Sequence, residues 1–137
     1  MRRYNAFAKC ETRDMRRLIP VMAVLMICGC SKAPLTIHDK PLSYWLDEAK
    51  KPDAASRKKA VEALGKAATA DRDAMAAVVA ALKDADAEVR DAAVLALLNI
   101  GPSASDAAND LRELANQDPD PKVREHAEKA LKRIEDR

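Results

Sequence analysis

Apolar residues between positions 53 and 135 recur every three or four residues, in three segments separated by polar turns. The middle segment shows this spacing most clearly, at Ala93, Ala96, Leu97 and Ile100. Side chains spaced in this way lie on one face of an α-helix, and the polar residues between them lie on the other. The pattern therefore predicts three amphipathic helices, each of which needs a neighbour to cover its apolar face.

The three segments are copies of one another. Each has an aspartate, an arginine four residues later, two alanines and a leucine. The matched residues are Asp53, Asp86 and Asp120; Arg57, Arg90 and Arg124; Ala60, Ala93 and Ala127; Ala63, Ala96 and Ala130; and Leu64, Leu97 and Leu131. Successive matches are separated by 33 and then 34 residues, and a fixed period of this size is the signature of a solenoid.

Shorter helical segments alternate with the copies, at about residues 42–50, 74–83 and 105–116. Each shared aspartate precedes a helix, where its carboxylate can accept hydrogen bonds from free backbone N–H groups. The order of segments predicts an all-α fold of three antiparallel helix pairs. These pairs cover about residues 41–67, 71–101 and 104–135.

The shared pattern, D-x-x-V-R-x-x-A-x-x-A-L, resembles the HEAT repeat in the short form found in bacterial HEAT-like and phycobilisome-lyase-like proteins. The middle copy follows the pattern throughout, whereas the first has Ser56 where the others have valine. The resemblance implies a short right-handed α-solenoid of three HEAT-like pairs over residues 41–137. It also implies that Tyr44 and Trp45 cover the open end of the first pair.

The repeated arginines allow two interpretations. They could form a ladder that binds an anionic ligand, or each could pair with an aspartate of its own or a neighbouring repeat and line the seam between repeats. The aspartate and arginine of each copy are four residues apart, which brings side chains together on a helix. The resemblance to HEAT repeats implies the structural interpretation for Asp53, Arg57, Asp86, Arg90, Asp120 and Arg124.

Positions that differ between the copies are the candidates for partner binding. The middle copy carries Val94, Leu95 and Leu98 where the outer copies are mostly charged. One hypothesis is that these three residues form an apolar floor on which a partner segment docks. The alternative is that two of the three pack inward. The charged residues expected to surround the floor are Lys58, Glu62, Glu125 and Lys129.

A different pattern precedes the repeats, in the segment MRRLIPVMAVLMICGC that starts at Met15. Two arginines are followed by ten mostly apolar residues, which suits a signal peptide and is too short to span a bilayer. The ending Ile-Cys-Gly-Cys resembles the lipobox of bacterial lipoproteins, with Cys30 as the lipidated residue. The alternatives are a stray apolar segment, or a disulfide or metal clip between Cys28 and Cys30.

This interpretation divides the chain into a signal peptide over residues 1–29, a lipidated cysteine and polar linker over 30–40, and the repeat domain. Residues 1–14 fit the signal peptide poorly, which suggests that Met15 is the true start. The mature protein is expected to be exported and lipid-anchored to the cell membrane or outer membrane, facing the periplasm.

Charge and candidate chemistry narrow the function further. The chain has a net charge of +2, but residues 1–29 carry six basic and two acidic side chains, so the remainder carries −2. No nucleic-acid partner is therefore expected. The sequence shows no catalytic, metal-binding or cofactor motif. We expect a non-catalytic scaffold with an unknown protein partner and possible self-association; the alternative is a bilin-lyase-like or enzyme-accessory role.

Overall fold

The computed structural model describes residues 35–136, which include all three copies of the repeat. The predicted signal peptide, the alternative start and the proposed lipidation site at Cys30 lie outside the described residues.

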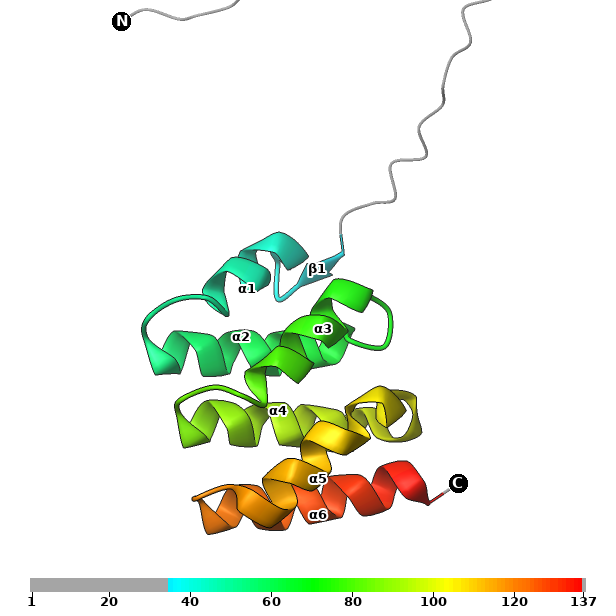
Figure 1. The fold of residues 1–137 in the computed structure, drawn as a ribbon. Helices are drawn as coiled ribbons and strands as arrows, with labels where there is room; N and C mark the ends of the chain where they lie inside the picture. The colour runs from blue at the N-terminus through cyan, green and yellow to red at the C-terminus, as the bar shows by residue number, and fades with distance from the viewer. Residues whose placement is uncertain (1–34, 137) are drawn as a thin grey trace, which may run out of the picture. The chain divides into compact units, whose positions relative to one another are not determined.

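The described residues fold into α-helices with one small hairpin, which confirms the prediction of a short all-α HEAT-like solenoid. The helices α2, α4 and α6 stack side by side in one layer, and α1, α3 and α5 cover them in a second layer (Figure 1). The elements are β1 (Thr36–Ile37), β2 (Lys40–Pro41), α1 (Leu42–Glu48), α2 (Ala54–Ala67), α3 (Arg72–Ala81), α4 (Ala87–Ile100), the 3₁₀ segment η1 (Gly101–Ala107), α5 (Ala108–Gln117) and α6 (Pro121–Glu135).

The repeated aspartates start the helices of the α2–α4–α6 layer as predicted. The carboxylate of Asp53 accepts from the backbone N–H of Ser56, at 2.8 Å, and Asp86 and Asp120 cap α4 and α6 in the same way. Each cap satisfies N–H groups that have no partner within the helix. Asp71 also caps α3, which the sequence analysis missed.

The core lies between the two layers and follows the matched apolar positions. Leu64 and Leu97 are fully buried, and the matched alanines are buried in all three copies. Because alanine is small, the helices approach closely. One such close approach is at Gly65 in α2, where an added Cβ would lie 2.7 Å from the Cβ of Ala96 in α4.

The third helix pair departs from the expectation of one helix over residues 105–116. Gly101 ends α4 with a φ of +67°, in the left-handed region that glycine adopts readily. A 3₁₀ segment then leads into α5, and Ala104 within it has non-helical dihedral angles. Ala107, which precedes α5, has no side chain that could cap the helix. The local sequence therefore gives this helix a gradual start.

The predicted linker over residues 30–40 is too long, because residues 36–41 fold onto the first helix pair. Strands β1 and β2 pair around a two-residue turn at His38 and Asp39, both with positive φ. Ile37 is buried, and the indole N–H of Trp45 donates to its carbonyl oxygen at 2.9 Å. The hairpin and Trp45 thus cover the first pair, while Tyr44 remains exposed.

Candidate binding surfaces

Two of the repeated arginines, in the first turns of α2 and α4, join adjacent repeats. The Nε and Nη2 atoms of Arg57 donate to the two carboxylate oxygens of Asp84, at 2.7 and 2.8 Å. Arg90 makes the same paired contact with Asp118, at 2.7 and 2.9 Å. Paired hydrogen bonds of this kind are stronger and more directional than a single one.

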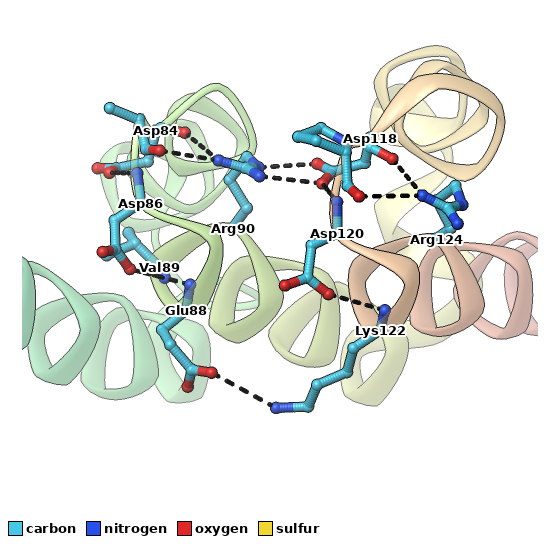
Figure 2. A network of polar contacts seen from close by, with 11 residues as sticks. Asp84, Asp86, Glu88, Val89, Arg90, Asp118, Asp120, Lys122 and Arg124 are labelled. Carbon is cyan, nitrogen blue, oxygen red and sulfur yellow. Dashed lines mark hydrogen bonds and ion pairs between the residues drawn. The ribbon is translucent and has the colours of Figure 1, made fainter.

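The same arginines also hold the turn before their own helix. Nη1 of Arg90 donates to the backbone carbonyls of Asp84 and Ala85, at 2.9 and 3.1 Å (Figure 2). Arg57 makes the corresponding contacts with the carbonyls of Lys51 and Pro52. Each guanidinium therefore orders one turn and binds the next, which is the geometry of a structural residue.

The aspartates that pair with these arginines are not the ones that the spacing indicated. The four-residue spacing suggested Asp53 and Asp86, but these carboxylates are used as helix caps. The actual partners, Asp84 and Asp118, lie 27 and 28 residues after their arginines. A sequence signal did exist, since both begin an Asp-x-Asp segment whose second aspartate is the cap.

The seam contacts set the ionisation of their carboxylates. Hydrogen bonds from Arg57 lower the pKa of Asp84 below its ordinary value, against a smaller opposing effect of burial. For Asp118 burial is the larger influence and acts to raise the pKa, but Arg90 and the N–H of Asp120 together outweigh it and the pKa is lowered. Both aspartates are therefore ionised at neutral pH.

The third arginine differs from the other two. Nη1 of Arg124 donates to the carbonyls of Asp118 and Pro119, at 2.6 and 3.2 Å, as its counterparts do in their own turns (Figure 2). No carboxylate of residues 35–136 pairs with its Nε or Nη2 atom. The structural interpretation thus describes Arg57 and Arg90 fully, and Arg124 only in part.

The proposed apolar floor is partly wrong. Val94 is fully buried in the core and cannot meet a partner. Its counterpart Val61 is also buried, among side chains of α1, α3 and α4, whereas Glu128 at the same position of the third copy is exposed. The position is therefore apolar in the copies where neighbouring helices cover it and charged in the copy where it is exposed. Leu98 is half-buried and packs against the core, so its apolar character has the same origin.

Leu95 does border an open surface. A groove of about 290 Å³ lies between α2 and α4, with Leu95 half-buried at its edge. Small residues form its floor, and Glu62, Lys66 and Asn99 supply polar groups around it. The groove is lined by Glu62, Gly65, Lys66, Ala92, Leu95, Ala96 and Asn99. Sequence reasoning found Glu62 and Leu95 but missed the rest, because the groove depends on how closely the helices approach.

The other charged residues predicted around the floor do not line this groove. Lys58 pairs with Glu88 of α4, at 2.8 Å. Glu125 and Lys129 pair with each other along α6, at 2.6 Å. Among the predicted partner-binding residues, the structure therefore brings only Glu62 and Leu95 together.

A buried carboxylate lies at the boundary between α4 and α6. Asp91 is 5 % exposed and contacts Nδ1 of His126 at 2.5 Å and Nζ of Lys122 at 2.9 Å. Burial acts to raise the pKa of Asp91, but the two basic partners outweigh it and the pKa is lowered. Asp91 of α4 thus contacts two side chains of α6, an arrangement that joins the second and third repeats.

A second groove, of about 490 Å³, lies between the end of α3 and α5. Leu82 and Leu114 give it an apolar part, and the seam residues Asp84, Arg90 and Asp118 border it. Across residues 35–136, His, Cys, Asp and Glu side chains form no group that could hold a metal ion. Within the same residues, no helix is both long and apolar enough to cross a membrane.

The fold and the repeated seam agree with a comparison to known families. The family model described as HEAT repeats matches residues 42–132, from the start of α1 into the last turn of α6. The chain belongs to the HEAT-repeat family. Members of this family commonly act as protein-interaction scaffolds, and the seams described above are the contacts that hold the HEAT pairs together. A comparison with curated proteins found no match to the chain.

Proposed function

We propose that this HEAT-repeat chain is a non-catalytic protein-interaction module, anchored to a bacterial membrane through a lipid on Cys30 and facing the periplasm. The observation that carries the interaction role is the groove between α2 and α4. It offers an apolar edge at Leu95 and polar groups at Glu62 and Asn99, a combination typical of surfaces that orient a bound segment.

The proposed anchor would hold this module close to the membrane. The described fold begins at Leu35, so only four residues, or five Cα–Cα steps, separate it from Cys30. A chain of this length spans at most about 18 Å when fully extended. The first helix pair would therefore lie near the lipid headgroups, and the groove would be displayed next to them.

Membrane fractionation of the wild type and Cys30→Ala tests the anchor. We expect the wild type in the membrane fraction, with the added mass of a lipid on residue 30, and the variant in the soluble fraction. A soluble wild type without a lipid would contradict the proposed anchor and leave the interaction role to be tested separately.

Crosslinking and mass spectrometry of the anchored protein test the groove. Leu95→Asp places a charge at its edge, and we expect the variant to fold and lose the crosslinked partners. Leu114→Asp, which changes a half-buried leucine bordering the α3–α5 groove, is the matched control. Loss of partners in the control alone, with both variants folded by circular dichroism, would contradict the proposed docking surface.

A further inference from the structure

The repeats provide an internal standard for what an arginine at this position binds. Arg57, Arg90 and Arg124 all donate through Nη1 to the carbonyls five and six residues before them. This contact fixes the guanidinium, so that its Nε and Nη2 atoms point away from its own turn, toward the place where the next repeat would lie. In the first two repeats the outward edge holds an aspartate. In the third, no carboxylate of residues 35–136 occupies it, and the side chain is half-buried.

The occupant in both seams is part of a recurring local structure. Asp84 and Asp118 each accept a hydrogen bond from the backbone N–H two residues later, at 2.9 Å. This contact orients the carboxylate before it meets the arginine. The second aspartate of the segment then caps the following helix. The edge of the arginine is thus complementary to the first aspartate of an Asp-x-Asp segment.

We propose that the Nε–Nη2 edge of Arg124 binds the first aspartate of an Asp-x-Asp segment in a partner protein, in the geometry of the two internal seams. The inference rests on the proposed interaction role but uses a different surface from the α2–α4 groove. Charge complementarity and the two seams of this chain identify the chemistry of the occupant.

A second copy of the chain does not fit as the occupant. Two of its three Asp-x-Asp segments already pair with Arg57 and Arg90 through Asp84 and Asp118. The third, Asp71-Arg72-Asp73, differs from both seams because its first aspartate is itself the cap of α3, and Arg72 beside that aspartate would repel Arg124. At the corresponding place in its first repeat it carries Lys51, two residues before the cap Asp53, and this lysine would repel Arg124.

The surroundings of Arg124 favour a short loop over a stacked helix pair. In the middle repeat, Val94 is buried and Leu98 is half-buried, whereas the matching residues of α6, Glu128 and Lys132, are charged and exposed. A stacked pair would bury these charges without partners, which is costly. A loop that reaches only the arginine edge leaves them in water.

The test is a titration of ¹⁵N-labelled full-length protein with an acetylated and amidated hexapeptide, Lys-Asp-Ala-Asp-Ala-Glu, which copies residues 83–88. We expect a saturable shift of the Arg124 Nε–Hε signal in the NMR spectrum, while the Arg57 and Arg90 signals stay in place. The peptide with Asp84→Asn should bind about tenfold more weakly, and the peptide with Asp86→Asn much less so.

Arg124→Lys keeps the charge but removes the forked geometry, and should also weaken binding about tenfold, measured at the backbone amides of the first turn of α6. Arg133→Lys is the matched control, because residue 133 lies on the opposite side of the same helix from residue 124. We expect the control to bind as the wild type does. Circular dichroism of both variants verifies that they fold.

Four results would overturn the inference: no saturable shift, equal weakening by the two asparagine peptides, unchanged binding by Arg124→Lys, or a shift that follows protein concentration without peptide. Equal weakening would indicate an unspecific anion contact, and a concentration-dependent shift would indicate contact between copies. Leu95→Asp should bind the peptide normally. The groove and the Arg124 edge can therefore fail independently.

Discussion

Arg90 and Arg124 have the same sequence context and the same contact with their own turn, but they lie at different places in the stack. Arg90 lies in a seam, where its side chain is 10 % exposed and Asp118 only 2 %. Arg124 lies on the last described helix and keeps only its backbone contacts. A repeated residue in a solenoid therefore has a role set by what the next repeat supplies.

The same comparison explains the apolar positions. Val94 is buried because the α5–α6 pair follows it, whereas Glu128 at the matched position is exposed. Leu97 is fully buried, and Leu131 is half-buried. Differences between copies therefore report which neighbouring helices cover each residue before they report function.

The largest expected effect comes from breaking the seam between Arg90 and Asp118. Arg90→Ala leaves the buried carboxylate of Asp118 without its partner, which costs about 3 kcal/mol in the free energy of unfolding. Arg124→Ala removes a partly buried and an exposed contact with backbone oxygens and leaves no carboxylate without its partner, at a cost of about 1 kcal/mol. Urea unfolding followed by circular dichroism measures both.

The double variant Arg90→Met/Asp118→Leu is the control for this experiment. It removes both charges together, and we expect it to recover part of the loss, because it leaves no buried charge unpaired. The contacts of Arg90 with its own turn and of Asp118 with the N–H of Asp120 stay lost. Equal losses for Arg90→Ala and Arg124→Ala would contradict the difference between the seam and the end.

Next in size is the packing of the matched leucines. Leu97→Ala removes a fully buried side chain and should lower the free energy of unfolding by about 2–4 kcal/mol. Leu131→Ala removes a half-buried one and should cost about half as much, since less surface is returned to water. Thermal unfolding of the two variants checks the order, and a larger effect at Leu131 would contradict it.

A smaller effect is expected where two helices touch. Gly65→Ala gains helix propensity but places a Cβ against Ala96, so we expect a net loss of about 1 kcal/mol. Adding Ala96→Gly should relieve the clash and leave the double variant closer to the wild type than the sum of the two single changes. Additive losses in urea unfolding would show that the contact at Gly65 is not tight.

The smallest effect on the free energy of unfolding is expected from protonating a single aspartate at low pH. Asp84, Asp91 and Asp118 have pKa values below those of an unfolded chain. The stabilisation that they give is therefore present above the ordinary aspartate pKa of about 3.9 and is lost as the pH falls below it. Unfolding midpoints between pH 7 and pH 3 measure this loss, which should be smaller in Asp118→Asn. A midpoint that rises on acidification would contradict it.

The sequence predicted those features that depend on neighbouring residues. The helices and the aspartate caps of α2, α4 and α6 follow from spacing within a few residues, and the structure has them except for the start of α5, where a 3₁₀ segment replaces the expected helix. The partners of Arg57 and Arg90 were not predicted, because they lie about one repeat away and a closer aspartate was available. The hairpin before α1 was also missed, since its strands are two residues long.

The candidate site was predicted less well, and for a physical reason. Leu95 and Glu62 were found because they differ between copies, but Val94 and Leu98 differ for reasons of packing. The α2–α4 groove depends on the close approach at Gly65, which no local pattern reports. That the Nε and Nη2 atoms of Arg124 lack a carboxylate among the described residues follows only from comparison with the partners of Arg57 and Arg90, which the sequence does not identify.

Hydrogen exchange of the arginine side chains tests the central claim most directly. The Nε–H of Arg90 and Arg57 donates to a carboxylate within a seam, whereas that of Arg124 has no such acceptor among the described residues. NMR of the full-length protein should show slow exchange with solvent for Arg90, somewhat faster exchange for Arg57, and the fastest for Arg124. Protection of Arg124 equal to that of Arg90 would contradict the account.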